Sequence, residues 1–312
     1  MGVILTNNNQ GGSIKVLRTP GLSEGYTRVG NYVLDAFPGA VAAYSLRKLR
    51  YNYKGPVIRV RRSSDNAEQD IGFDGDGIGS RLDERALLAF VGNANGFVTM
   101  WYDQSGNGMD QTRVTANEQP QIVTNGTIYT DNGKHAIYFD GTKSFRSINT
   151  ISLTSPAGEW SSFGVTNPTA DRITVPVYLS FDAIFNGIEY RIGQFLSHGR
   201  TGNPRQRTVA FSSISPFTDL GIRQTFNQAI VNSIRTTTSV EVFTNKITDG
   251  PTINLGIPIT GITPLDIGYR NGITVNQSQP FGYIQELIHY PLNSTSFHQR
   301  MVDSMNIYYK AY

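Results

Sequence analysis

The chain has no cysteine, few charged residues and no long apolar run. The absence of cysteine excludes disulfides and thiolate metal sites. Charged residues make up 16% of the 312 residues, below the roughly 25% usual for soluble domains. The net charge of +3 includes no block of like charges, so we expect no nucleic-acid partner. No apolar stretch reaches the roughly 18 residues of a membrane span, and residues 1–12 lack the apolar core of a signal peptide.

Glycine-rich turns and short apolar segments are abundant instead. The sequence has 32 glycines and a hydrophobic fraction of 38%, and turn signals recur about every eight to twelve residues, the rhythm of an all-β sandwich. Strands are expected at residues 57–62, 98–102, 121–123, 127–129, 136–139, 174–181, 189–195, 208–212, 228–235, 240–245, 264–269 and 281–290. Helical spacing of apolar residues predicts helices near 40–50, 84–91 and 294–309, the last two capped by Asp83 and Ser294.

Residues 98–108, Val-Thr-Met-Trp-Tyr-Asp-Gln-Ser-Gly-Asn-Gly, form the most distinctive string. An apolar strand ends in six residues that are polar or glycine, which predicts a sharply defined corner. Two interpretations stay open. Asp103, Gln104 and Asn107 can read sugar hydroxyls beside a stacking aromatic ring. Alternatively, the corner satisfies its own backbone and the aromatic residues are buried.

This string resembles the signature of the concanavalin A-like lectin/glucanase (LamG-like) β-sandwich domain. That domain occurs in bacteriophage structural proteins and is related to the arabinofuranosidase B catalytic domain. Similar strings continue through residues 42–65, 86–98, 136–141 and 281–288. The resemblance implies an all-β, concanavalin-like jelly-roll sandwich of two antiparallel sheets over residues 36–312, with a few short helices. Residues 1–35 lie outside it and are expected to form an N-terminal attachment arm.

Three departures from the arabinofuranosidases weigh against inherited catalysis. The position that matches their acid Asp falls on Tyr269 or Arg270, and arginine cannot donate a proton at physiological pH. Their pair of adjacent cysteines is missing. Their nucleophilic Glu has only Asp182 and Glu189 as candidates, and neither matches convincingly. We therefore expect no catalytic residues and no enzyme, with an arabinofuranosidase-type glycoside hydrolase as the alternative.

The expected function is that of a bacteriophage virion structural protein, a head or tail fibre, decoration or appendage made in the host cytoplasm. Residues 1–35 would bind other virion proteins, and the chain would form a homo-oligomer, most simply a trimer. The sandwich would attach to a cell-surface polysaccharide through loops such as 200–207 and 270–279. A purely structural decoration protein and a secreted carbohydrate-binding module are further alternatives. Ligand-binding candidates are Tyr269, Arg270, Asn271, Asp103 and Asn107.

No cofactor and no metal are expected. Residues 65–79 hold five acidic residues among glycines, but they lack the roughly 12-residue loop with a terminal Glu that marks a calcium site. The four histidines are scattered and are expected to be surface or satisfied core residues. Arg59, Arg61 and Arg62 can clamp an acidic sugar or a phosphate, but a solvated strand face with local ion pairs is the expectation.

Overall fold

The chain is described by a computed structural model at residues 32–152, 159–169, 177–185, 188–198, 204–212, 227–237, 239–248, 253–254, 262–268 and 280–312. Within these ranges the fold is all-β, as predicted, and its helices are short: α1 Val33–Ala36, α2 Glu84–Val91, α3 His298–Tyr309 and the 3₁₀ turn η1 Ala116–Glu118. The strands are β1 Ala42–Ser45, β2 Ile58–Arg62, β3 Glu68–Ile71, β4 Gly96–Trp101, β5 Gln111–Thr112, β6 Gln121–Thr124, β7 Thr127–Ile128, β8 Thr130–Asp131, β9 Lys134–His135, β10 Ile137–Asp140, β11 Arg146–Ser147, β12 Thr150–Ser152, β13 Trp160–Pro168, β14 Val177–Phe185, β15 Ile188–His198, β16 Pro204–Ser212, β17 Ala229–Arg235, β18 Ser239–Thr244, β19 Ile247–Thr248, β20 Ile253–Asn254, β21 Ile262–Pro264 and β22 Phe281–Tyr290.

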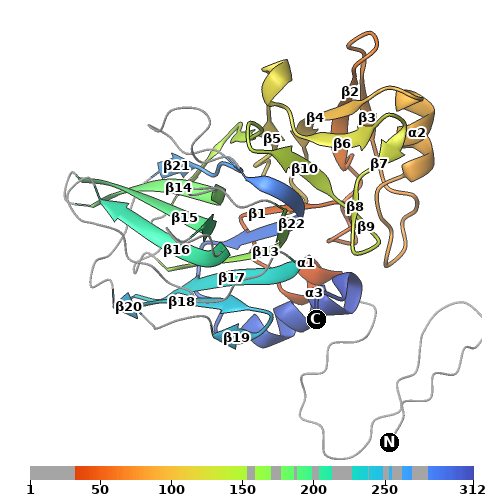
Figure 1. Ribbon diagram of the computed structural model, residues 1–312. Helices are drawn as coiled ribbons and strands as arrows, with labels where there is room; N and C mark the ends of the chain where they lie inside the picture. The colour runs from red at the N-terminus through yellow and green to blue at the C-terminus, as the bar shows by residue number, and fades with distance from the viewer. Residues whose placement is uncertain are drawn as a thin grey trace, which may run out of the picture.

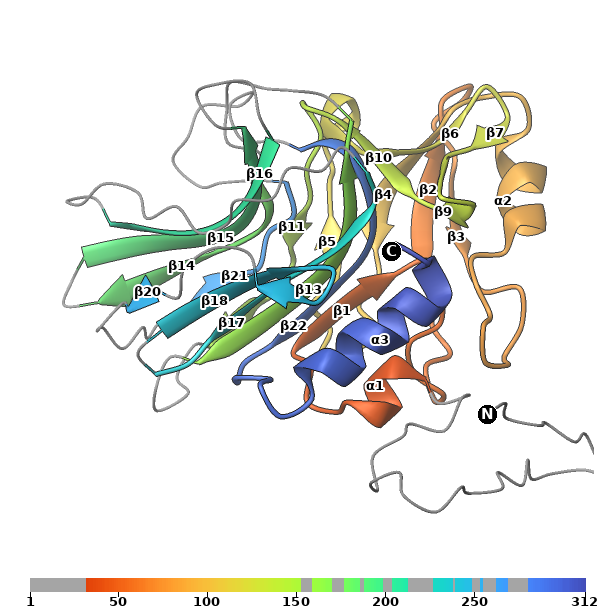
Figure 2. The ribbon, with the colours of Figure 1, turned by 60° about the horizontal axis from the view of Figure 1, so that its bottom comes forward.

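One large antiparallel sheet carries most of these strands, in the order β11-β5-β4-β6-β10-β22-β13-β17-β18-β19. A separate three-stranded sheet, β14-β15-β16, forms a second layer on the left of Figure 1. Helix α3 runs along β1 and β22 with α1 beside it (Figure 2). The central strand β22 pairs with β1, β10 and β13, so it joins segments from both ends of the chain.

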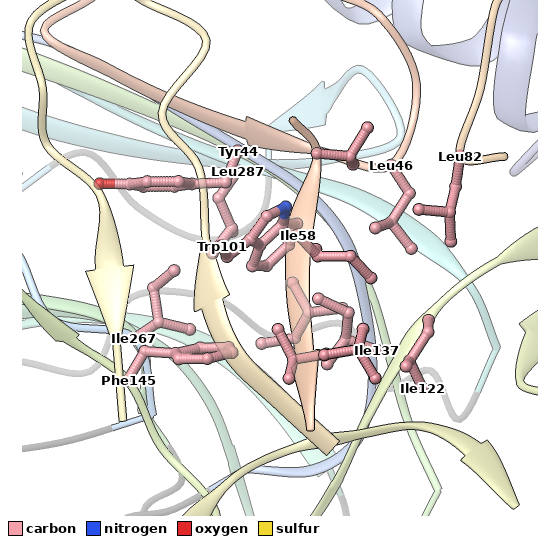
Figure 3. Packing of buried hydrophobic residues seen from close by; sticks show 14 of the residues in the cluster. Tyr44, Leu46, Ile58, Leu82, Trp101, Ile122, Ile137, Phe145, Ile267 and Leu287 are labelled. Atoms are coloured by element: carbon pink, nitrogen blue, oxygen red, sulfur yellow. The ribbon is translucent and has the colours of Figure 1, made fainter. Parts of the chain in front are cut away.

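Two apolar cores stabilise this arrangement. The first packs around Trp101, which is fully buried and lies 5.8 Å from the ring of Tyr44 and 6.3 Å from that of Phe145 (Figure 3). The second lies under the helices, where Met301 and Met305 of α3 share a buried cluster with side chains of β13, β17 and β22. The same strands contribute side chains to both cores, because successive side chains of a strand point to opposite faces of the sheet.

Sequence patterns within a few residues predicted most of the strands, helices and turns correctly. Strand β2 buries Ile58 and Val60, and α2 begins where Asp83 accepts a hydrogen bond from the backbone N of Ala86 at 2.9 Å. Strands β6, β7, β10 and β22 also lie where the sequence placed them, and β4 begins two residues earlier than expected. The expected hairpins turn at Asn125–Gly126 and Asn132–Gly133, where all four residues have the positive φ that such turns need.

Two helix predictions need correction. The segment predicted as a helix near 40–50 contains strand β1, which is buried throughout and pairs with β22 from Ala42–His289 to Ser45–Glu286. The C-terminal helix begins at His298 rather than 294, and the residue before it, the N-cap Phe297, makes no side-chain capping hydrogen bond. Ser294 contributes its backbone carbonyl instead, which accepts from the amides of Phe297 and His298.

Part of the predicted arm belongs to the folded body. Residues 32–35 precede the expected boundary, yet Val33 and Leu34 are buried in the second core. The rest of the arm, residues 1–31, lies outside the described residues, so its role in attachment stays a prediction. None of the helices in the described ranges has the length and apolarity to cross a membrane.

Candidate functional site

The corner after β4 is held by the carboxylate of Asp103, which is 4% exposed. Its Oδ1 accepts hydrogen bonds from the backbone N atoms of Ala43 and Ser105, both at 2.8 Å. Its Oδ2 accepts from the Ser105 hydroxyl at 2.6 Å and from the backbone N of Met109 at 3.1 Å. Donors from β1 and from both sides of the corner therefore converge on one carboxylate.

Gln104 extends the same contact along the following segment. Its Oε1 accepts from the backbone N of Leu49 at 2.8 Å, and its Nε2 donates to the carbonyls of Ser45 and Arg47 at 2.9 and 3.0 Å. This side chain is fully buried. It gives hydrogen-bond partners to three backbone groups of a segment that is not helical.

Asn107 is the exposed member of the corner. Its Nδ2 lies within 3.1 Å of the carbonyls of Ala40 and Val41 and 2.9 Å from the Ser105 hydroxyl. Gly106 and Gly108 flank it with φ of +89° and +68°, values that favour glycine. The corner is thus fixed by its own hydrogen bonds.

Trp101, the larger aromatic residue of the signature, is not free to stack on a sugar. Trp101 is fully buried in the first core, and Tyr102, half-buried, donates from its hydroxyl to Asp70 Oδ1 at 2.7 Å. This geometry agrees with the structural interpretation of the corner. Both oxygens of Asp103 are already occupied, and sugar binding by Asp103 and Asn107 stays a prediction.

The other predicted ligand-binding residues, Tyr269, Arg270 and Asn271, lie outside the described residues, as do 200–203 and the whole of the predicted loop 270–279. Residues 204–207, predicted as part of a loop, belong to strand β16 instead. Just before them, Asp266 is described and is 3% exposed. Its Oδ1 accepts from the backbone N of Ser147 at 3.1 Å, and its Oδ2 lies 3.5 Å from Arg146 Nε.

Four carboxylates of the acidic stretch 65–79 contact basic side chains. Ion pairs join Arg62 to Asp65 at 2.6 Å, Arg59 to Asp70 at 2.7 Å, Arg81 to Asp74 at 3.5 Å, and Lys48 and Lys54 to Asp76 at 2.9 and 3.0 Å. Arg59 and Arg62 of β2 therefore form local ion pairs, as expected, whereas Arg61 donates to the amide oxygens of Gln119 and Asn66. No group of three or more His, Asp or Glu side chains gathers into a metal-binding cluster within the described part of the chain.

Glu286 forms a buried ion pair that the sequence did not reveal. Arg47 donates to it from Nε at 2.7 Å and from Nη2 at 2.8 Å, and the hydroxyls of Ser45 and Tyr309 donate to Oε2 at 2.8 and 3.0 Å. Burial acts to lower the pKa of Arg47, but the neighbouring carboxylate raises it by more. A carboxylate with no exposed surface and four protein donors cannot reach a substrate, so Glu286 ties β1 and β22 to α3 instead.

The described histidines are dispersed, as the sequence indicated. His289 is fully buried and lies 2.7 Å from the Ser162 hydroxyl through Nδ1, and burial lowers its pKa to about 3. Burial also lowers the pKa of His298, to about 4, so both rings are neutral at pH 7. The His135 side chain is 9% exposed and its Nε2 lies 3.4 Å from the exposed carboxylate of Glu84.

The backbone brings together two carboxylate positions that the sequence separated. Strands β14 and β15 are antiparallel, with Asp182 opposite Arg191 and Glu189 opposite Ile184. Positions 182 and 189 are therefore diagonal neighbours on one face of the three-stranded sheet. Diagonal positions lie roughly 7–8 Å apart. The paired carboxyls of glycosidases lie about 5 to 5.5 Å apart in retaining enzymes and about 6.5 to 9.5 Å apart in inverting ones, so this face is the candidate catalytic face.

Residues 32–163 match the family model of the catalytic domain of α-L-arabinofuranosidase B. This range holds the corner, β1 to β12 and nearly half of β13, and it ends before the positions 182 and 189. No curated protein matches the chain in sequence.

Solved arabinofuranosidases share the fold. A glutamate-to-glutamine mutant of a glycoside hydrolase family 54 α-L-arabinofuranosidase, soaked with 4-nitrophenyl α-L-arabinofuranoside, has a TM-score of 0.63 at 16% identity, covering 90% of this chain and 65% of that chain. An arabinofuranosidase complexed with arabinofuranosyl-α-1,2-xylobiose has a TM-score of 0.60 at 16% identity, covering 90% of this chain and 64% of that one. The chain therefore spans about 65% of the length of such enzymes.

These findings correct the expected function. The expectation of a bacteriophage virion structural protein without enzymatic activity is wrong, because the matching family model is a catalytic domain and the similar structures are arabinofuranosidases. The alternative, a glycoside hydrolase of arabinofuranosidase type, is the one they favour. The link to the LamG-like domains of phage proteins finds no support among these matches. Nothing in them bears on the predicted homo-oligomer or on the location of the protein.

Proposed function

We propose that the chain is a glycoside hydrolase that releases arabinose from α-L-arabinofuranosides. The observation that carries this proposal is the match of residues 32–163 to the catalytic-domain family model, supported by a shared fold over 90% of the chain. Hydrolysis of a glycosidic bond needs two carboxyl groups that flank it, one acting as the acid. Asp182 and Glu189 are the proposed pair, because the β14–β15 register makes their positions diagonal neighbours on one face.

This assignment also accounts for the residues that depart from the arabinofuranosidase pattern. Tyr269 or Arg270 stands where those enzymes carry their acid, so the proton must come from another carboxyl group. The buried carboxylates of Glu286 and Asp103 are held by protein donors, and that of Asp266 is almost without exposed surface. They are poor alternatives, because a catalytic acid must reach the glycosidic oxygen.

The test is the release of 4-nitrophenol from 4-nitrophenyl α-L-arabinofuranoside by the purified chain and by its Asp182→Asn and Glu189→Gln variants. Each variant should lower kcat by about 10²- to 10⁴-fold, the usual contribution of a catalytic acid or base. Glu68→Gln, an exposed carboxylate change on β3, is the matched control and should keep full activity. Wild-type protein without turnover, or full turnover in both variants, would contradict the proposal.

A further inference from the structure

A cavity of about 370 Å³, widely open to solvent, is lined by residues 53–55 and 72–76. The rings of Tyr53 and Phe73 form part of its lining, with centroids 6.2 Å apart and planes at 83°. This volume is within the range of roughly 300–1,000 Å³ typical of small-molecule sites. Residues 72–76 directly follow β3, and both views place β2 and β3 at the end of the molecule away from β14, β15 and β16 (Figures 1 and 2). The cavity is therefore separate from the candidate catalytic face.

The charged groups of the lining are paired. Asp76 accepts from Lys48 Nζ at 2.9 Å and lies 3.0 Å from Lys54 Nζ. Asp74 accepts from the backbone N of Arg81 at 2.9 Å, and its carboxylate lies 3.5 Å from Arg81 Nε. A divalent cation would have to displace these basic groups, whereas a phosphate or an acidic sugar would meet two carboxylates. The charge balance therefore favours a neutral ligand.

The same groups can still bind hydroxyls. The side chains of Lys54 and Asp76 are 61% and 76% exposed, so each presents donors or acceptors to solvent beside the two aromatic rings. Hydrogen bonds from ionised groups are stronger than neutral ones, and aromatic rings cover the apolar C–H surface of a sugar. We propose that this cavity binds a short segment of a neutral saccharide, at a site distinct from the candidate catalytic face.

Two glycines of the same loop make the proposal testable. Gly72 lines the cavity, whereas Gly77 does not. Neither has a positive φ, and a Cβ added at either would meet no atom within 4 Å. A leucine at Gly72 should therefore fill the cavity without straining the backbone. A leucine at Gly77 places the same side chain in open space outside the cavity, which makes it the matched control.

Binding is measured by saturation-transfer NMR and titration with arabinotriose, xylotriose and cellotriose as neutral probes, trigalacturonate as the acidic probe, and Ca²⁺ alone. The wild-type chain should bind at least one neutral trisaccharide, and Gly72→Leu should weaken that binding about tenfold or more, as expected when a ligand no longer fits. Gly77→Leu should bind as the wild type does. Thermal unfolding of the three proteins establishes that each is folded.

Four outcomes would overturn the proposal: no neutral probe binds, Gly72→Leu binds as well as the wild type, Gly77→Leu loses binding equally, or Ca²⁺ or trigalacturonate is the ligand that Gly72→Leu excludes. Turnover of 4-nitrophenyl α-L-arabinofuranoside is measured in the same samples. Saccharide binding that depends on Gly72 supports the cavity site even where the chain hydrolyses nothing. Hydrolysis without such binding contradicts the cavity site and leaves the proposed function standing.

Discussion

Replacing Asp103 by alanine should destabilise the whole fold, because it removes the acceptor of three backbone N–H groups and one hydroxyl. The three amides belong to Ala43, Ser105 and Met109. A buried donor left without a partner costs roughly 1–3 kcal/mol. The corner borders the exposed stretch 106–108, where water can reach some of these groups. We therefore expect Asp103→Ala to lower the free energy of unfolding by about 3–5 kcal/mol, among the larger effects of one substitution.

Asp103→Asn refines the same prediction. Its remaining oxygen can still accept from Ala43 and Ser105, but its amide group now faces the backbone N of Met109, donor against donor. The expected loss is about 1–3 kcal/mol. Urea unfolding followed by tryptophan fluorescence measures both variants, because Trp101 lies in the core beside the corner.

Glu68→Gln, exposed on β3, is the control and should stay within about 0.5 kcal/mol of the wild type. The reasoning is refuted if Asp103→Ala unfolds at the same urea concentration as this control. Loss of saccharide binding at unchanged stability would instead show that Asp103 reads sugar hydroxyls.

Three further predictions follow from buried groups and a helix cap. Glu286→Ala should cost about 3–5 kcal/mol of unfolding free energy because Arg47 is left unpaired in the interior, and Arg47→Met combined with Glu286→Leu should recover much of that loss. The pKa of His289 is lower in the folded chain, about 3, than its ordinary 6.5, so the unfolded chain takes up the proton first. Stability should be full above about pH 6.5 and fall by up to roughly 1.4 kcal/mol per pH unit below it, and His289→Gln should flatten that part of an unfolding-versus-pH profile. Asp83→Ala should cost about 1 kcal/mol by removing the cap of α2, with Asp83→Asn as the conservative control; equal stability of all three proteins would contradict the role of the cap.

Local chemistry explains which elements could be predicted. Asn-Gly turns favour the positive φ that hairpins require, and alternation such as Ile58 and Val60 against Arg59 and Arg61 defines a half-buried strand without knowledge of its partner. Asp83 caps α2 through a bond to a residue three positions away. In each of these cases the information lies within a few residues of the element.

Strand β1 was mispredicted because its structure depends on distant residues. Its ladder partner is β22, which begins at residue 281, and its backbone is also held by Asp103 and Gln104. A strand buried on both faces has no polar face to show alternation, so its apolar spacing resembles that of a helix. The first residue of the C-terminal helix could not be predicted for a related reason. An apolar stripe predicts that a helix forms, but where it begins depends on the backbone hydrogen bonds to the carbonyl of Ser294, and the spacing of apolar residues does not reveal them.

The site residues were harder to place for the same reason. The acidic stretch 65–79 shows only its own carboxylates, whereas the basic side chains that pair with Asp76 come from residues 48 and 54. The cavity beside it is likewise built from two segments about 20 residues apart. The one signal in the sequence was the group of glycines at 55, 72 and 75, which leaves the lining without side chains at those positions.

The signature string predicted the fold correctly and the function wrongly, and the geometry shows why. The side chains of Asp103 and Gln104 form their hydrogen bonds with β1 and the segment that follows it. A β-sandwich needs these structural bonds whether or not it has a catalytic centre. The carboxylates proposed for catalysis lie beyond the matched range, on β14 and β15. Substitutions at the corner and at the proposed catalytic residues should therefore affect stability and kcat independently. Asp103→Asn should lower stability while the folded fraction keeps its kcat, and Asp182→Asn should lower kcat with an unchanged unfolding midpoint. If Asp182→Asn instead unfolds the chain, or if Asp103→Asn lowers the kcat of fully folded protein, the division between a structural corner and a catalytic face is wrong.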